Sequence, residues 1–213
     1  MTSQNTQAFI NFALSQDILQ FGDFTLKSGR KSPYFFNAGL FYTGEQLQRL
    51  GEFYAQTLIE HKIEFDILFG PAYKGLPLAT STAIALQSQH QTNISVSFNR
   101  KEAKQHGEGG QLIGAPLAGK KVVIIDDVIT AGTAFREAKQ QIAEAGGKLV
   151  GLVIALNRQE IGQNQVSAIQ EIEQHEQIPV MNIICLDDII DYLDSQQDQR
   201  SLQAIRAYRE KYG

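Results

Sequence analysis

The chain has 213 residues, of which 43% are hydrophobic and 20% are charged, with a net charge of −4. This length supports one sizeable core, and the mild acidic balance argues against general nucleic-acid or membrane-surface binding, which needs a strong basic excess. The single cysteine excludes an internal disulfide, and no Cys/His spacing typical of zinc sites occurs. The N-terminus is a poor signal peptide and no apolar run reaches membrane-spanning length, so we expect a cytoplasmic protein.

The first elements differ from the rest of the chain. Apolar residues at helical spacing predict an amphipathic helix over residues 6–19. Residues 21–37 are aromatic and basic, with glycines and a proline between, and predict short strands and turns that form a flap. A second helix is expected over residues 44–61.

From residue 65 onward strands alternate with helices. The expected strands are residues 65–69, 94–98, 121–125, 149–156 and 180–184, with helices at 75–88 and 132–145 and two more after the last strand. This alternation predicts an α/β fold with a central, mostly parallel sheet flanked by helices. In such sheets ligands bind beyond the carboxyl ends of the strands. No internal repeat or domain break interrupts the pattern, so we expect a single domain, residues 1–213.

The most informative segment is residues 122–134, in which a buried strand leads into a short turn and a helix. Asp126 and Asp127 end the strand, and the turn offers backbone amides, hydroxyls and the positive end of the helix dipole, which suit a phosphate. Gly132 allows a close backbone approach. The carboxylates can accept hydrogen bonds from sugar hydroxyls or hold hydrated Mg²⁺. The alternative is an ordinary capped strand end, but the whole run favours a ribose 5-phosphate site.

This segment resembles the signature of the type I phosphoribosyltransferases: an apolar strand, two acidic residues, two apolar residues, then Thr-x-Gly-Thr. The resemblance implies the type I phosphoribosyltransferase fold. It also implies that the acidic pair binds the ribose hydroxyls of phosphoribosyl pyrophosphate and that the turn binds its 5-phosphate. These roles fall on Asp126, Asp127, Val128, Ile129, Thr130, Ala131, Gly132, Thr133 and Ala134.

A second loop follows the first strand of the sheet. Gly70, Pro71 and Gly75 predict a tight turn at a helix start, and exposed amides plus Lys74 suit a diphosphate. The alternative is a plain strand–helix turn with a solvated lysine. The loop resembles the pyrophosphate-binding loop of orotate-specific enzymes, which implies that Tyr73 and Lys74 contact the diphosphate.

Residues 100–110 are basic and glycine-rich and lack an apolar stripe, which predicts a mobile surface loop. Such a loop can close over a polyanion and stabilise charge on a leaving diphosphate; the alternative is a solvated loop without function. It resembles the catalytic lid of orotate phosphoribosyltransferases, which reaches across a dimer interface, and this implies a homodimer with shared sites. The expected diphosphate contacts in this lid are Arg100, Lys101, Lys104 and His106. The expected catalytic residues are Lys74, Lys104, His106, Asp126 and Asp127.

The base is expected to bind under an N-terminal hood, residues 20–40. The rings of Phe35 and Phe36 can stack on a planar base, although adjacent phenylalanines can also serve core packing. The segment is similar to the orotate-binding hood, with its Leu-Lys-Ser-Gly-x-x-Ser-Pro-Tyr-Phe pattern, which implies that Lys27 contacts the substrates. Arg158 follows a strand at the correct edge and can bind the orotate carboxylate in a bidentate way, unless it is simply solvated. Thr130 is implied as a second orotate contact.

The resemblance spans the whole chain and is strongest to the bacterial form of the orotate phosphoribosyltransferase family. It implies Mg²⁺-dependent transfer of the 5-phosphoribosyl group to orotate, giving orotidine 5-phosphate and pyrophosphate in UMP synthesis, with Mg²⁺ held mainly through the diphosphate and water. A first alternative is a phosphoribosyltransferase for another base, which Arg158 and the Phe35–Phe36 pair argue against. A second is a non-catalytic regulator that binds phosphoribosyl pyrophosphate, although no basic recognition helix is evident.

Overall fold

The computed structural model describes residues 3–26, 29–104, 110–130, 132–162 and 165–213, and gives only the backbone for residues 102–104. The helices are α1 (Gln4–Ser15), α2 (Gly44–His61), α3 (Gly75–His90), α4 (Thr133–Glu144), α5 (Ala168–Glu176), α6 (Leu186–Ser195) and α7 (Gln199–Tyr212). The strands are β1 (Leu19–Thr25), β2 (Lys31–Phe36), β3 (Ile67–Gly70), β4 (Ser95–Lys104), β5 (Gly110–Gly114), β6 (Lys121–Asp126), β7 (Lys148–Asn157) and β8 (Val180–Cys185).

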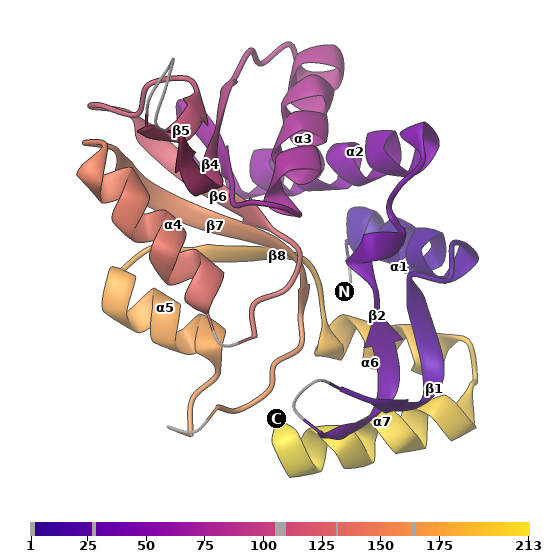
Figure 1. The fold of residues 1–213 in the computed structure, drawn as a ribbon. Helices are drawn as coiled ribbons and strands as arrows, with labels where there is room; N and C mark the ends of the chain where they lie inside the picture. Colours follow the sequence, from indigo (N-terminus) through magenta and orange to yellow (C-terminus); the bar gives the residue numbers. More distant parts are fainter. Residues whose placement is uncertain (1–2, 27–28, 105–109, 131, 163–164) are drawn as a thin grey trace.

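The central sheet has six strands in the order β5-β4-β3-β6-β7-β8 (Figure 1). All neighbouring pairs are parallel except β4 and β5, which are antiparallel. The prediction of a mostly parallel sheet flanked by helices is confirmed. Because β6 lies in the middle, its C-terminal end has strand ends on both sides, and the acidic pair is delivered to the centre of the edge where ligands bind.

Successive residues of the central strand pack on opposite faces of the sheet, as strand geometry requires. Val122 and Ile124 of β6 pack in a core with side chains of α4 and α5. Val123 and Ile125 pack in a second core with α1, α2, α3 and α6. Figure 1 shows α4 and α5 together on one side of the sheet and α2 and α3 on the other. Burial on both faces explains why β6 is an unbroken apolar run.

The N-terminal flap is an antiparallel hairpin of β1 and β2, separate from the central sheet. Its inner side packs on α1 and on α7, with the ring of Tyr34 edge-on to that of Tyr208 at a centroid distance of 6.0 Å. In Figure 1 the hairpin stands next to α7, the last helix of the chain. The expected strands and turns are therefore a hairpin whose position depends on the last helix.

Four boundaries or elements differ from the sequence-based expectation. Helix α1 ends at Ser15 rather than 19, because Asp17 adopts a left-handed φ of 55° and the chain turns into β1. Strand β4 runs to Lys104, so residues 100–104 are strand backbone rather than loop. Strand β5 was not expected, and neither was α5. Both are short, and neither has an apolar run long enough to separate it from a loop by periodicity.

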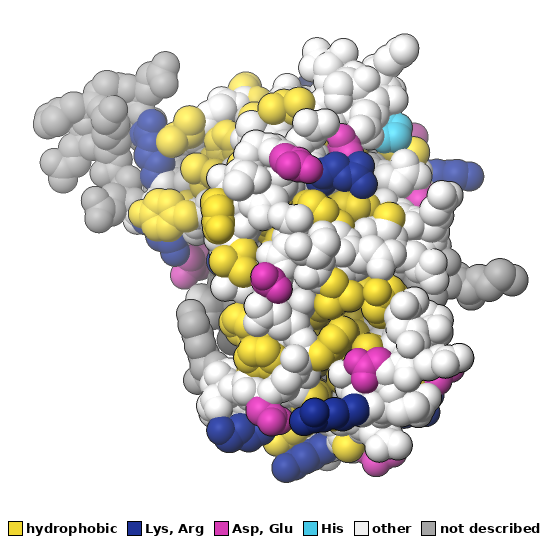
Figure 2. Space-filling model, turned by 90° about the vertical axis from the view of Figure 1, so that its right-hand side faces the viewer, with side chains coloured by type: hydrophobic (Ala, Val, Ile, Leu, Met, Phe, Trp, Pro, Cys, Tyr) yellow, Lys and Arg dark blue, Asp and Glu magenta, His cyan; other side chains and the backbone are white. Residues whose placement is uncertain are grey.

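Figure 2 shows the face on the right-hand side of Figure 1. Basic and acidic side chains are interspersed there, and hydrophobic side chains gather in a broken band between them. Within the described residues, the helices are all too short or too polar to traverse a bilayer.

Candidate active site

The ends of β3, β6 and β7 meet at one edge of the sheet. The β6 residue Ile124 is in register with Phe69 of β3, and Asp126 is in register with Ile154 of β7. The loops that follow these strands therefore start side by side. They carry Lys74, the acidic pair and Arg158, which the sequence assigned to one site.

The acidic pair is buried and held by its backbone. Asp126 and Asp127 are 8% and 9% exposed. The Tyr54 hydroxyl donates to the Asp126 carbonyl at 2.7 Å, and the Asp127 carbonyl accepts from the backbone N–H of Ala155 at 2.9 Å and of Leu156 at 3.2 Å. The backbone of both residues is thus fixed by α2 and β7, which presents the buried acidic pair at a defined position at the strand end.

Burial and, to a lesser extent, the nearby charge of Asp127 raise the pKa of Asp126 to about 7, while Lys74 acts in the opposite direction. The Asp127 backbone N–H donates to Asp126 Oδ1 at 2.9 Å and also favours the charged form. Near neutral pH the Asp126 carboxyl is therefore present both with and without its proton. Such a group can donate one hydrogen bond and accept others, which suits a pair of vicinal hydroxyls.

Lys74 crosses from the β3 loop to the acidic pair. Its Nζ lies 2.5 Å from Asp127 Oδ2, with side-chain exposures of 59% for the lysine and 13% for the aspartate. The loop that presents it is tightly closed: a Cβ on Gly70 would lie 2.2 Å from the Gly75 carbonyl oxygen. This close approach requires glycine and brings the start of α3 directly onto the strand end.

The same loop is anchored from β4. The Ala72 N–H donates to the buried Asn99 side chain at 2.6 Å, and the Ala72–Tyr73 peptide is cis. Tyr73 is 73% exposed, so its ring stands at the surface beside Lys74. Asn99 has no signature of its own in the sequence, and its role follows only from the parallel pairing of β3 and β4.

The turn after β6 forms an open helix start. Gly132 is the N-cap of α4 with a left-handed φ of 69°, and no side chain caps the helix. Val128 and Ile129 are half-buried against the two cores, whereas Thr130, Thr133 and Ala134 are exposed. Ala131 lies outside the described residues. The uncapped amides of α4 and the exposed hydroxyls point to an anion, since helix N-termini attract negative charge.

The basic segment after β4 is only partly described. Arg100 is half-buried and Lys101 is exposed. Residues 100–103 fall in an irregular stretch of the β4–β5 pairing, between the Asn99 and Lys104 registers. The expectation of a loop beginning at Arg100 is wrong at that point, because β4 continues to Lys104. The Lys104 side chain and His106 lie outside the described residues.

The side chains of the two adjacent phenylalanines of the hood lie in different surroundings. The Phe35 ring is half-buried and stacks on Phe24 at 5.5 Å and 26°. The Phe36 ring is 9% exposed and packs on Phe9 and Phe41 in the core. Core packing, which was one interpretation of the pair, therefore holds for the Phe36 side chain. Lys27 lies outside the described residues.

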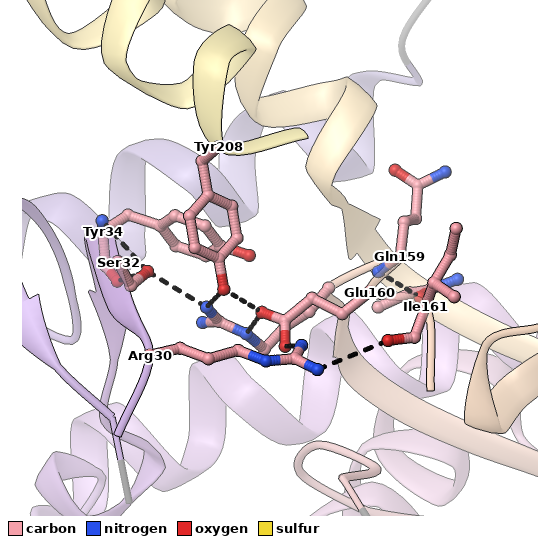
Figure 3. Close-up of polar contacts among 9 residues, drawn as sticks. Arg30, Ser32, Tyr34, Gln159, Glu160, Ile161 and Tyr208 are labelled. Atoms are coloured by element: carbon pink, nitrogen blue, oxygen red, sulfur yellow. Dashed lines mark hydrogen bonds and ion pairs between the residues drawn. The ribbon is translucent and has the colours of Figure 1, made fainter. Parts of the chain in front are cut away.

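Arg158 follows β7 and is held rather than solvated. Its side chain is 11% exposed, and Nε lies 2.6 Å from Glu160 Oε1. Nη2 donates to the Ser32 hydroxyl at 3.1 Å and to the Tyr208 hydroxyl at 3.4 Å. The guanidinium thus lies between β2 of the hood and α7, and Figure 3 shows its partners Ser32, Glu160 and Tyr208. Sequence reasoning found Arg158 but not Glu160 or Tyr208, because their roles depend on contacts between distant segments.

Comparisons with known proteins agree with this geometry. Residues 41–162 match the phosphoribosyl transferase domain family. The chain is 57% identical over 206 residues to an orotate phosphoribosyltransferase of Pseudomonas aeruginosa and 56% identical to one of Klebsiella pneumoniae, with 96% of each chain covered.

Solved structures agree as well. A crystal structure of orotate phosphoribosyltransferase from Francisella tularensis has a TM-score of 0.89 at 43% identity, covering 97% of this chain and 99% of that one. The fold also resembles that of Leishmania donovani UMP synthase, with a TM-score of 0.73 over 98% of this chain and 41% of that one. The chain therefore belongs to the orotate phosphoribosyltransferase family.

Proposed function

We propose that this protein transfers the 5-phosphoribosyl group of phosphoribosyl pyrophosphate to orotate, giving orotidine 5-phosphate and pyrophosphate on the route to UMP. The names of relatives at 56–57% identity over nearly the whole chain support the reaction. The observation that carries it is the buried Asp126–Asp127 pair beside the uncapped start of α4, with Lys74 reaching in from β3. A diol acceptor, a phosphate cradle and a cation adjoin one another there.

The donor substrate would bind along the edge of the sheet. Asp126 and Asp127 take the ribose hydroxyls, and residues 128–134 take the 5-phosphate through backbone amides and hydroxyls. Lys74 then exchanges part of its pairing with Asp127 for the diphosphate, since a half-exposed ammonium is free to turn. Tyr73, Arg100 and Lys101 complete the diphosphate side, with Lys27 reaching in from the hood.

The reaction is a substitution at the anomeric carbon. The proton on orotate N1 passes to the departing diphosphate, the nitrogen pair forms the new bond to C1′, and the electron pair of the C1′–O bond leaves with the diphosphate. The transition state has oxocarbenium character, so no covalent nucleophile is needed. The enzyme orients the two substrates and stabilises departing charge. We assign the second task to Lys74, Lys104 and His106.

The base would bind between the hood and the end of β7. The Phe35 ring is the stacking surface, because the Phe36 ring packs in the core and leaves only its backbone to meet the base edge. Arg158 takes the orotate carboxylate, and Thr130 supplies a second polar contact. This arrangement favours an acidic pyrimidine over an uncharged purine.

We propose Mg²⁺ as the cofactor, held mainly by the substrate diphosphate and water. In the described residues no group of three or more His, Cys, Asp or Glu side chains could hold a metal ion. The acidic pair supplies at most two carboxylates, which fits an ion that keeps most of its ligands from substrate and solvent. Bound Mg²⁺ would neutralise charge on the leaving diphosphate.

We further propose a homodimer in the cytoplasm. The segment around residues 100–110 would act as a lid over the partner's site, an arrangement that the family resemblance implies. The basic residues at its start, Arg100 and Lys101, lie on β4 at the ligand-binding edge.

The test is a spectrophotometric assay with purified protein. Loss of orotate absorbance that requires phosphoribosyl pyrophosphate and Mg²⁺ is expected, together with loss of turnover in Asp127→Asn. Glu64→Gln is the matched control, because its exposed carboxylate pairs with Lys121 at the opposite end of β6. Turnover with a purine but not orotate would replace the base assignment. Binding of phosphoribosyl pyrophosphate without turnover of any base would indicate a regulator instead.

A further inference from the structure

A cluster of charged and aromatic side chains joins three distant parts of the chain: β2 with the turn before it, the loop after β7, and α7 (Figure 3). We call it the hood–α7 cluster. Its members are Arg30, Ser32, Tyr34, Arg158, Glu160 and Tyr208. It lies at the base end of the site, and the roles assigned above use only Arg158.

Glu160 is the centre of the cluster. Its Oε1 accepts from Arg158 Nε at 2.6 Å and from the Tyr208 hydroxyl at 2.7 Å. Its Oε2 accepts from Arg30 Nη1 at 3.1 Å. The side chain is 19% exposed. One carboxylate is therefore shared by two guanidinium groups, and the cluster keeps a surplus of one positive charge, which matches a substrate carrying one carboxylate.

The bonds to Arg158 use one side of its guanidinium. Nε pairs with Glu160, and Nη2 donates to Ser32 and Tyr208. The guanidinium carbon lies 4.2 Å above the centre of the Tyr34 ring, which covers one face. Throughout the described chain, the hydrogen bonds of Arg158 come from Nε and Nη2. The remaining nitrogen, Nη1, carries two N–H groups that can donate hydrogen bonds to a carboxylate.

We propose that Glu160 and Tyr208 are positioning residues that fix Arg158 for the carboxylate of an acidic base, and that α7 thereby takes part in substrate selection. The proposal rests on the function proposed above, in which the base is orotate. A long arginine side chain loses rotational freedom when it binds a ligand, and a guanidinium already fixed by a carboxylate and a hydroxyl loses less. Preorganisation of this kind acts on the carboxylate and on no other part of the ligand.

Charge and position make opposite predictions for Glu160→Gln. The substitution raises the charge of the cluster from one to two positive units, so attraction alone would strengthen binding of an anionic base. Loss of the acceptor for Arg158 Nε would instead free the guanidinium and weaken it. We expect the loss of positioning to exceed the gain in attraction. The charge-assisted bond from Glu160 to Arg158, whose side chain is 11% exposed, is stronger than a long-range attraction screened by water.

The experiment compares two ligands that differ by one carboxylate, orotidine 5-phosphate and UMP. Their dissociation constants are measured by calorimetry on wild type, Glu160→Gln and Tyr208→Phe. We expect the preference for orotidine 5-phosphate to fall about tenfold in Glu160→Gln and a few-fold in Tyr208→Phe. The affinity for UMP should stay within about twofold, since UMP lacks the group that Arg158 holds.

Two matched controls exclude a general effect of the substitutions. Glu52→Gln removes a carboxylate that pairs with Arg49 on α2, and Tyr192→Phe removes a hydroxyl that bonds Asn11. Neither should change the preference. Tyr208→Phe keeps the ring against Tyr34, so the variant remains informative even where Glu160→Gln destabilises the fold.

Three other results would contradict the positioning role or the proposed function. An unchanged or increased preference in Glu160→Gln would overturn the positioning role, and an equal loss of affinity for both ligands would reduce the cluster to a structural brace. A wild type that does not prefer orotidine 5-phosphate over UMP would overturn the proposed function itself, whatever the variants do.

Discussion

Asp126 titrates in surroundings that oppose its charge. Its pKa is raised to about 7 by burial and by Asp127, whereas an unfolded aspartate titrates near pH 3.9. Between these two values the folded state holds a proton that the unfolded state has lost. The free energy of unfolding therefore falls as pH rises from about 4 to about 7. The buried acidic pair, which we propose accepts the ribose hydroxyls, therefore costs stability near neutral pH.

This gives a test with a defined sign. Asp126→Asn has no titrating group at this position, so its melting temperature should rise relative to wild type as pH increases from 4 to 8, while its activity falls. Glu64→Gln is the control, because the pKa of Glu64 is lowered by Lys121 and its removal cannot give a rise. A gap between wild type and Asp126→Asn that does not change with pH would contradict the argument.

Lys74 is the second residue whose contribution can be separated. Lys74→Ala removes an ion pair whose lysine is 59% exposed and whose aspartate is buried, so solvent screening limits the expected change in unfolding free energy to about 1 kcal/mol. Turnover should fall by about a hundredfold, because the variant loses the cation that we propose faces the leaving diphosphate. The measurements are kcat/KM for phosphoribosyl pyrophosphate and a urea unfolding curve.

Lys139→Ala is the matched variant, since Lys139 pairs with Glu176 at the same 2.5 Å and lies on α4 away from the acidic pair. It should share the small stability change and keep full turnover. Equal turnover in the two variants would remove Lys74 from the catalytic residues.

At the scale of elements, α5 shows how a short helix depends on its ends. It has nine residues, and Ser167 and Gln170 form a capping box at its start. Ser167→Ala should lower the free energy of unfolding by about 1 kcal/mol, with kcat/KM unchanged because the helix packs on the sheet face away from the hood. Thermal unfolding and the orotate assay together check this, and a loss of turnover at unchanged stability would be inconsistent with it.

Most of the central sheet could be predicted because its strands are buried on both faces and therefore appear as apolar runs. Helix α2 was predicted with its observed bounds, Gly44–His61. The end of α1 could not be predicted from the sequence. Ile18 and Leu19 are buried just before and at the start of β1, and apolar residues at these positions would fit a continued helix equally well. The capping box at Ser167 was a usable signal for α5, but a nine-residue helix gives periodicity too little length to confirm it.

The residues of the site also differ in how far the sequence predicts them. Residues 126–134 are contiguous, so their pattern is visible in the sequence, and the resemblance of the hood and lid segments rests on equally local patterns. Asn99, Tyr54 and Glu160 hold these segments in place through contacts that join distant parts of the chain. Such partners follow from topology rather than from local spacing. The sequence therefore points to the groups that we propose meet the substrate, whereas the groups that support them follow only from the structure.

At the scale of the whole molecule, the proposed dimer makes a quantitative prediction. Asp127→Asn would inactivate its own site, and a chain with Lys104→Ala and His106→Ala would carry a defective lid. If the lid serves the partner's site, mixing the two inactive proteins should restore about a quarter of wild-type sites, since half of the dimers are mixed and each has one intact site.

The check is activity after the two variants are unfolded and refolded together, against each refolded alone. No recovery in a mixture shown to contain mixed dimers would mean that each lid serves its own chain.

The hood–α7 cluster also sets an order of events during synthesis on the ribosome. Ser32 and Arg158 are 126 residues apart, and Tyr208 comes 50 residues after Arg158. At ordinary elongation rates the nascent chain therefore contains the acidic pair for on the order of several seconds before Tyr208 is available to contact Arg158. During that interval the half of the site that we propose binds the sugar phosphate can assemble, whereas the half that we propose selects the base requires α7. The proposed binding site for phosphoribosyl pyrophosphate can therefore form before the proposed binding site for the base.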